Sequence, residues 1–233
     1  MSLILVTGTS TGLGLATAQA LADSGHDVVV HARTASRVPS GKWSGALTGD
    51  LTDLEAVRAL ARDADTFGAF DAVVHNAGAL HPPEAVHVNT IAPYVLTASM
   101  RRPDRLIYLS SSMHRGGGTD LGGLRTGSAS YSDSKLWVTA MALAIAGRWR
   151  DTLVHAVDPG WVPTRMGGAG APDDLREGHL TQVRLATDES VTPRTGGYWH
   201  HLSTQRPAAA ATDAAFHERL LTVLAETTGV SIG

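Results

Sequence analysis

The chain has 233 residues, 43% apolar and 18% charged, a composition that suits one α/β domain with a buried core and excludes a disordered chain. Its 22 acidic and 19 Lys or Arg side chains give a net charge of −3, without the basic excess typical of proteins that bind nucleic acids or anionic membranes. The absence of cysteine excludes disulfides, thiolate catalysis and cysteine-ligated zinc.

Short apolar runs alternate with helical patterns along the whole chain. We expect strands at Leu3–Val6, Val28–Val30, Ala46–Leu47, Ala72–Val74, Leu106–Leu109 and Leu153–Val157, and helices at Gly12–Ser24, Leu54–Ala61, Val88–Met100 and Tyr131–Trp149, with later ones opening at 172–174 and around Phe216. Such alternation is typical of βαβ units, in which helices cover both faces of a parallel sheet. The sequence therefore predicts a doubly wound, Rossmann-type α/β sheet of about seven strands in a single domain, residues 1–233, with ligands at the carboxyl ends of the strands.

The first strand is followed by the glycine-rich segment 7–14, Thr-Gly-Thr-Ser-Thr-Gly-Leu-Gly, and then by the first helix. Glycines let the backbone approach a pyrophosphate closely, and a helix start offers free N–H groups. A glycine-rich loop without a ligand is the alternative, and a P-loop is excluded because no Gly-Lys-Ser/Thr follows. We predict that a dinucleotide contacts Gly8, Ser10, Thr11, Gly12, Leu13 and Gly14.

The end of the second strand bears on the choice between NAD and NADP. An acidic residue there usually holds the ribose 2′-hydroxyl of NAD, but Ala32 occupies this place and Arg33 follows it. An arginine can pair with the 2′-phosphate of NADP, which a carboxylate would repel. The alternative is that Arg33 is a solvated loop cation, but the missing acid and the added base together favour NADP(H).

Tyr131 and Lys135 lie four residues apart on a predicted helix, so their side chains share one face. An ammonium beside a phenol favours the phenolate, and we therefore expect Lys135 to lower the pKa of Tyr131. Such a tyrosine can serve as the acid when a carbonyl is reduced and as the base when an alcohol is oxidised. The spacing alone is a weak signal, since any helix can carry it by chance.

Three serines, Ser110, Ser111 and Ser112, directly follow the predicted fifth strand. A hydroxyl at this edge of the sheet can bond a carbonyl oxygen that becomes an alkoxide during hydride transfer. The residues alone leave the choice among the three serines open.

These motifs together resemble the short-chain dehydrogenase/reductase family. Three of its patterns occur here in order: the Thr-Gly-x-x-x-Gly-x-Gly turn at 7–14, Tyr-x-x-x-Lys at 131–135 and Pro-Gly-x-x-x-Thr at 159–164. The resemblance implies that Ser111, the second serine after the strand, is catalytic together with Tyr131 and Lys135. It also implies that Asn89 is the fourth catalytic residue, which holds a kinked helix and a water; a helix N-cap is the alternative.

The same resemblance implies further contacts to the cofactor. Asp50 would border the adenine, although it could instead cap the next helix, for which Asp53 is the better candidate. His75 stands where the family has the first Asn of its Asn-Asn-Ala-Gly segment. Backbone near Val162 would orient the nicotinamide carboxamide, and Thr164 would hold the phosphate region. The implied cofactor-binding residues are Asp50, Leu51, Asn76, Ala77, Gly78, Tyr131, Lys135, Pro159, Gly160, Val162 and Thr164.

Some features point to a subgroup and to a mobile element. The pair Met113-His114 and the segment Gly196–Trp199 resemble retinol-dehydrogenase-like members, in which the latter is the last, edge strand. The Gly-rich stretch Arg165–Ala171 precedes a predicted helix, so we expect a short substrate lid at about residues 165–180.

The predicted helix 131–149 is apolar nearly all round, which requires cover on both sides. Small residues in it would let a twin helix approach, so we expect a homodimer or homotetramer, as in many members of the family. Cover by the chain's own C-terminal tail is the alternative, and the short segment Gly78–Asn89 keeps a monomer open.

The first apolar run ends at Val6 without a preceding basic region, and the apolar stretch Leu136–Gly147 is too short to span a bilayer, so we expect a cytoplasmic location. The eleven histidines are scattered, and the adjacent His200 and His201 would point to opposite faces of a strand, so no metal site is expected.

The sequence thus predicts an NADP(H)-dependent oxidoreductase that interconverts a small-molecule carbonyl and the corresponding alcohol, with no nucleic-acid or membrane partner. The alternative is a catalytically weak NADP(H)-binding protein with a regulatory or scaffold role.

Overall fold

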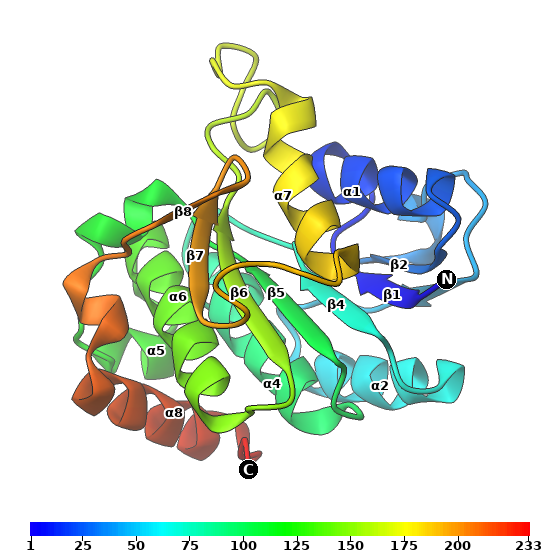
Figure 1. Ribbon diagram of the computed structural model, residues 1–233. Helices are drawn as coiled ribbons and strands as arrows, with labels where there is room; N and C mark the ends of the chain where they lie inside the picture. Colours follow the sequence, from blue (N-terminus) through cyan, green and yellow to red (C-terminus); the bar gives the residue numbers. More distant parts are fainter.

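A computed structural model describes all 233 residues, and its centre is one eight-stranded sheet (Figure 1). The strands run in the order β3-β2-β1-β4-β5-β6-β7-β8, and every neighbouring pair is parallel except β7 and β8. Their bounds are β1 Leu3–Val6, β2 Asp27–Ala32, β3 Gly45–Thr48, β4 Ala72–His75, β5 Arg105–Leu109, β6 Leu153–Asp158, β7 Gly197–His200 and β8 Ser203–Gln205. The order reverses between β1 and β4, the switch point at which such sheets open a crevice for ligands.

Helices cover both faces of this sheet. Helices α1 and α7 pack together on one face, and α2, α4, α6 and α8 lie on the other (Figure 1). The bounds are α1 Gly12–Asp23, α2 Leu54–Ala64, α3 Glu84–Val86, α4 Ala92–Ser99, α5 Gly122–Thr126, α6 Tyr131–Arg148, α7 Leu175–Thr187 and α8 Ala214–Thr228. The predicted doubly wound α/β class is therefore confirmed.

The central strands are mostly apolar because each contributes to two cores. In β1, Leu5 joins the core under α2, α4 and α6, whereas Ile4 and Val6 join the core under α1 and α7. Strand β5 repeats this division, with Tyr108 on the first side and Ile107 on the second. Successive side chains of a strand point to opposite faces, so a sheet that is covered twice shows no polar alternation.

One edge of the sheet differs from the prediction. Strand β8 pairs antiparallel beyond β7, so the sheet has eight strands and the prediction of Gly196–Trp199 as the edge strand is wrong. A two-residue loop joins the two strands, with φ of 43° at His201 and 64° at Leu202. Such left-handed conformations cost roughly 1–3 kcal/mol each in non-glycine residues. Hairpins of this kind normally carry Asn or Gly at these places, so no turn signal in the sequence announced β8.

Helix α6 is covered within the chain. Helix α8 and the turn Ala209–Thr212 pack against it, and most of its residues are buried. The oligomer was expected because this apolar helix needs cover on both sides, and the C-terminal part of the chain provides that cover. The homodimer or homotetramer stays a prediction. None of the helices combines the length and the apolarity that crossing a membrane requires.

Candidate active site

A cleft of about 870 Å³ opens at the carboxyl ends of the central strands. Its lining contains most of the predicted site residues: Gly8, Ser10, Thr11, Gly12, Leu13, Gly14, Arg33, Asp50, Leu51, Asn76, Ala77, Gly78, Tyr131, Lys135, Pro159 and Thr164. Asn89, Ser111, Gly160 and Val162 are not part of this lining. The cleft also includes His31 and Arg37, which the sequence did not single out. One cleft therefore joins the predicted cofactor residues to the Tyr-Lys pair.

The turn between β1 and α1 has a backbone shape that only glycine permits. Gly8 and Gly12 have φ of 71° and 64°. A Cβ on Gly8 would lie 2.7 Å from Cα of Ala77, and one on Gly14 would lie 2.4 Å from the carbonyl oxygen of Gly8. Helix α1 starts without a side-chain cap, so its first N–H groups are free to bind an anion. This cradle fits the pyrophosphate of a dinucleotide.

Asn76 ties the cradle to the end of β4. Its Nδ2 donates to the carbonyl oxygens of Thr7 at 2.9 Å and Gly8 at 3.3 Å. The hydroxyl oxygen of Thr7 accepts the N–H groups of Asn76 at 3.0 Å and Ala77 at 3.1 Å. The Oδ1 atom of Asn76 is buried and has no partner in the chain. A buried acceptor without a donor is uncommon, and beside the glycine cradle it fits a nucleotide hydroxyl or amine.

His31 also shapes this cradle, and the sequence alone did not point to it. Its Nδ1 accepts the N–H of Gly8 at 3.2 Å, and its Nε2 donates to the carbonyl of Gly49 at 3.0 Å. Burial lowers the pKa of His31, which keeps the ring neutral, the state in which Nδ1 can accept a hydrogen bond. The only signal in the sequence was a polar residue within the apolar run of β2.

The end of β2 places Arg33 at the mouth of the cleft. Its side chain is 60% exposed, and its Nε lies 3.7 Å from a carboxylate oxygen of Asp50. Asp50 accepts the N–H and the hydroxyl of Thr52, and the bond from the N–H in particular holds the pKa of this carboxyl below its usual value. Asp53, as expected, caps α2 in place of Asp50. Arg37, in the turn Ala35–Arg37, lines the same cleft, so two guanidinium groups border the cleft after the end of β2, where Ala32 replaces the acid of an NAD site.

Tyr131 and Lys135 lie on the first turns of α6, which begins at Tyr131 because Ser130 and Asp133 form a capping box. Lys135 is 3% exposed, and its Nζ donates to the carbonyl oxygen of Leu109 at 2.7 Å. The same Nζ lies 5.5 Å from the centre of the Tyr131 ring. The helix therefore presents the phenol and the ammonium together at the end of β5.

The geometry separates the three serines that follow β5. The hydroxyl of Ser111 faces the Tyr131 hydroxyl and accepts the N–H of Met113 at 3.2 Å. Ser110 borders the cleft but is almost fully buried, and its hydroxyl is engaged with that of Thr139 at 2.6 Å. Ser112 is exposed. This arrangement favours Ser111 as the serine that contacts a carbonyl oxygen.

Asn89 lies inside a helical stretch and not at its start. Helix α3, the π-helical turn His87–Ile91 and α4 follow one another without a break, so the N-cap alternative is wrong. The Nδ2 atom of Asn89 donates to the carbonyl of Ala79 and to the hydroxyl of Ser134, both at 2.9 Å, and the Oδ1 atom of Asn89 accepts the N–H of Ala79 at 2.8 Å. π-Helical turns are frequent at functional sites. Asn89 thus couples the segment after β4 to α6, one residue before Lys135.

Burial dominates the titration of the Tyr-Lys pair. It raises the pKa of Tyr131 to about 12; the hydroxyl of Ser111 lowers this pKa and the carboxylate of Asp158 raises it. Burial also lowers the pKa of Lys135 to about 8, against the opposing effect of Asp158. The net pKa of Tyr131 is thus raised because burial disfavours the phenolate, and the expectation that Lys135 lowers this pKa stays a prediction.

The segment after β6 closes the far side of the cleft. A Cβ on Gly12 would lie 3.2 Å from a side-chain carbon of Thr164, so Thr164 packs directly on the phosphate cradle. Val162 is buried, and its carbonyl accepts the N–H of Thr164 at 2.8 Å. Residues 165–174 form an irregular loop, which projects beyond the sheet before α7 begins (Figure 1). The expected lid region thus consists of this loop and the start of α7.

Comparison with known proteins places the chain in a family. A sequence model described as short chain dehydrogenase matches residues 2–92. The short-chain dehydrogenase chyC of Penicillium rubens is 37% identical over 222 residues, covering 85% of this chain and 86% of that protein. The short-chain dehydrogenase chry4 of Gibberella zeae is 34% identical over 256 residues, covering 100% and 99%. The chain belongs to the short-chain dehydrogenase/reductase family, oxidoreductases that act on carbonyl and alcohol groups with a nicotinamide cofactor.

Solved structures agree on the fold. An uncharacterised protein from Mycobacterium paratuberculosis has a TM-score of 0.83 at 23% identity, covering 100% of this chain and 95% of that one. A Shigella flexneri structure complexed with NADP has a TM-score of 0.71 at 22% identity, covering 87% and 97%. At these identities the likeness concerns the fold alone.

Proposed function

We propose that this member of the family is an NADP(H)-dependent enzyme that reduces the carbonyl group of a small molecule, or oxidises the matching alcohol, with Tyr131 as the acid and base. One observation carries the proposal: a single cleft has Tyr131 and Lys135 at one end and the glycine cradle with Arg33 at the other. The hydroxyl of Ser111 completes the catalytic end.

Four residues of the chain have different roles in the proposed reaction. A nicotinamide bound here would supply hydride to the carbonyl carbon or accept it from the alcohol. The hydroxyls of Ser111 and Tyr131 hold the carbonyl oxygen, and Tyr131 gives its proton to this oxygen as negative charge develops. In the opposite direction Tyr131 takes the proton back. Lys135 holds its positive charge toward Tyr131, and Asn89 fixes the helix that carries both residues.

The preference for NADP(H) rests on Arg33 and Arg37, and fluorescence titration with NADPH and NADH tests it. We expect NADPH to bind at least about tenfold more tightly, about 1.4 kcal/mol, and Arg33→Ala to remove most of this difference. Arg62→Ala, at an exposed position near the end of α2, is the matched control and should change neither affinity. Equal binding of NADH by the parent protein would show that the preference is wrong.

The catalytic role is tested by Tyr131→Phe in a carbonyl-dependent NADPH oxidation assay. The rate should fall roughly 100- to 10,000-fold, because the proton donor is lost, while NADPH still binds. Tyr94→Phe removes a buried hydroxyl far from the cleft, one that donates to Val230, and should leave the rate unchanged. If NADPH binds but no carbonyl compound is reduced and Tyr131→Phe has no effect, the regulatory or scaffold alternative replaces the enzyme.

Apolar side chains exposed at the carboxyl end of the sheet, where the cleft opens, favour a substrate with a bulky apolar part. Trp161 is 59% exposed, yet its backbone N–H donates to Asp173 at 2.6 Å and its indole N–H donates to the carbonyl of Gly167 at 2.8 Å. An exposed indole whose residue is held at the backbone and at the ring nitrogen suits a planar apolar group. Five of the seven large apolar side chains left exposed lie at this edge of the sheet: Leu80, Met113, Trp161, Met166 and Leu202. The retinol-dehydrogenase-like subgroup and the lid at 165–180 stay predictions.

A further inference from the structure

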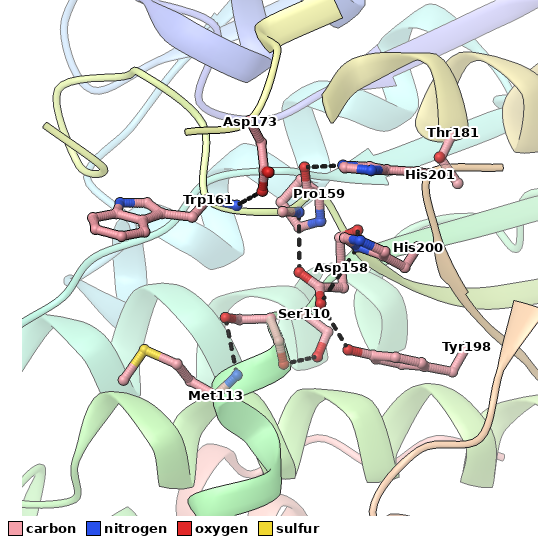
Figure 2. A network of polar contacts seen from close by, with 12 residues as sticks. Ser110, Met113, Asp158, Pro159, Trp161, Asp173, Thr181, Tyr198, His200 and His201 are labelled. Carbon is pink, nitrogen blue, oxygen red and sulfur yellow. Dashed lines mark hydrogen bonds and ion pairs between the residues drawn. The ribbon is translucent and has the colours of Figure 1, made fainter. Parts of the chain in front are cut away.

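Asp158, the last residue of β6, is a buried carboxylate that the chemistry above does not use. It is 5% exposed. Its Oδ1 accepts the N–H of Gly160 at 3.1 Å, and its Oδ2 accepts the hydroxyl of Tyr198 at 3.3 Å (Figure 2). The same Oδ2 lies 3.6 Å from Nδ1 of His200, and no Lys or Arg forms an ion pair with it. Carboxylates are rarely buried without a permanent cation, so this one requires an explanation.

The neighbouring turn, Pro159 to Trp161, is held mainly by side chains, and its one bond to other backbone runs from the N–H of Asp173 to the carbonyl of Trp161 at 3.1 Å. Asp158 binds the N–H of Gly160, and Asp173 binds the N–H of Trp161 at 2.6 Å, as Figure 2 shows. Gly160 has a φ of 82°. Pro159 lines the cleft, so this turn forms part of the cleft wall.

The loop of the hairpin between β7 and β8 also contacts the turn Pro159 to Trp161. The ring of His201 donates from Nε2 to the carbonyl of Pro159 at 3.4 Å. Leu202, also left-handed, donates its N–H to the hydroxyl of Thr181 at 2.9 Å. Strained residues persist only where their surroundings fix them, and they concentrate at functional sites. The strained hairpin and the buried carboxylate thus converge on one turn.

The charge of Asp158 also reaches the catalytic residues. The titratable groups on which its charge acts are Tyr131 and Lys135 on α6, His114 in the turn after β5, and Tyr198 and His200 on β7, the last two in direct contact with it. Its carboxylate raises the pKa of both Tyr131 and Lys135. The Lys135 ammonium has only the carbonyl of Leu109 as a direct partner, so Asp158 is the carboxylate that acts on it.

Building on the proposed function, we propose that Asp158 is a positioning residue of this active site: its buried carboxylate fixes the Pro159–Gly160 turn of the cleft wall and adds a negative charge to the environment of Tyr131 and Lys135. Asp158→Asn separates the two roles, because an amide oxygen still accepts the N–H of Gly160 but carries no charge. Asp158→Ala removes both.

The chain offers a direct test that needs no turnover, because Lys42 and Lys135 are its only lysines. Protein labelled with ¹³C at lysine Cε gives two side-chain signals, and the exposed Lys42 serves as the internal reference. Lys135 should titrate with a midpoint near 8 in the parent protein and roughly one pH unit lower in Asp158→Asn. Lys42 should not move. An unchanged Lys135 midpoint in folded Asp158→Asn overturns the electrostatic role.

Enzyme kinetics test both roles of Asp158 in the reaction itself. In Asp158→Asn the pH profile of alcohol oxidation should shift as a whole to lower pH, because the carboxylate raises the pKa of both Tyr131 and Lys135. Asp158→Ala should in addition lower kcat by about tenfold, with little change in the KM of the carbonyl compound. A purely structural role would lower the rates of both variants without moving the profile, and that result overturns the proposal.

A second variant covers the case in which Asp158→Asn does not fold. Tyr198→Phe keeps the charge and removes one hydrogen bond from the carboxylate, so kcat should fall several-fold at an unshifted pH profile. Tyr94→Phe is its matched control, with Tm lowered and kcat intact. If Tyr198→Phe, like its control Tyr94→Phe, leaves kcat unchanged, the hydrogen bond from Tyr198 does not position Asp158 and the proposal is wrong. If the parent protein binds NADPH but reduces nothing, the proposed function fails, while the lysine titration still decides on Asp158.

Discussion

Two turns face each other across the cleft, and they are held in different ways. The first, residues 7–14 after β1, contains three glycines, and a Cβ on Gly8 or Gly14 would collide with backbone atoms of the chain. The second, residues 159–161 after β6, is bound by the carboxylates of Asp158 and Asp173 and by the imidazole of His201, and a Cβ on Gly160 would meet only side-chain atoms. A turn that packs closely against backbone atoms tolerates almost no change, whereas a turn that packs closely against side chains can be tuned residue by residue. The first suits an invariant phosphate group, and the second suits the reacting end of the cleft.

The strongest test of this difference is Gly14→Ala. The new Cβ would lie 2.3 Å from the amide nitrogen of Asn76 and 2.4 Å from the carbonyl oxygen of Gly8, and the backbone at Gly8 cannot yield. We expect NADPH affinity to fall at least 100-fold, about 2.7 kcal/mol, in fluorescence titration. Gly147→Ala, where a Cβ would meet nothing within 4 Å, is the matched control and should leave affinity unchanged. A loss below tenfold would contradict the idea of a rigid first turn.

The same difference decided what the sequence could reveal. Gly8, Gly12 and Gly14 act through local backbone geometry, so their spacing predicted the first turn and its place after β1. Tyr131 and Lys135 share a helical face, which is again a local property. The sheet class followed from apolar runs that are buried on both sides.

The second turn stayed hidden because its partners come from elements that are distant in sequence. Asp158 meets Tyr198 and His200 only when β7 pairs with β6, and no residue pattern encodes this pairing. His31 was missed for the same reason, since its partners Gly8 and Gly49 become its neighbours only through the pairing of β2 with β1 and β3. The sign of the Tyr131 pKa shift also depends on burial, which spacing does not report.

Buried histidines allow a comparison of the stability of the strands that lead to the two turns at acid pH. Burial lowers the pKa of His75, on β4 beside the first turn, to about 3, and that of His155, on β6 leading to the second, to about 4. Each contributes stability above its unfolded value of 6.5 and loses it as the pH falls toward the folded value. At pH 5, which lies about 1.5 pH units below the unfolded pKa, the free energy of unfolding is lower by about 2 kcal/mol for each residue.

Urea unfolding at pH 7.5 and pH 5 measures this loss. We expect the free energy of unfolding of the parent protein to fall by about 4 kcal/mol from these two residues, and that of His75→Phe to fall by about half as much. The ring of His75 stacks on that of Tyr108 with centroids 4.7 Å apart, so a phenyl ring can take its place. The same pH dependence in both proteins would show that His75 can be protonated within the folded state.

Gly160→Ala probes the second turn in the way that Gly14→Ala probes the first. Its Cβ would lie 2.5 Å from a carboxylate oxygen of Asp173 and 2.8 Å from Nε2 of His201, both at the ends of side chains that can shift. The φ of 82° adds a cost of roughly 1–2 kcal/mol. We expect an NADPH Kd close to that of the parent and a kcat lowered about tenfold. A loss of nucleotide binding as large as that of Gly14→Ala would mean that the two turns do not differ.

The smallest effect is expected at Trp161, which belongs to the second turn and faces solvent. In Trp161→Ala, kcat/KM for a bulky aromatic ketone should fall about fivefold, roughly 1 kcal/mol, while that for a short aliphatic aldehyde stays constant. Phe67→Ala removes an aromatic side chain of 36% exposure that lies between α2 and the amino end of β4, away from the carboxyl ends of the strands, so it should change neither value. If Trp161→Ala lowers both values equally, the indole acts through its bond to Gly167 and holds the second turn in place. Trp161 would then join Asp158 and His201 as a residue that supports the cleft wall, and the choice of substrate would lie with the other apolar residues of the rim.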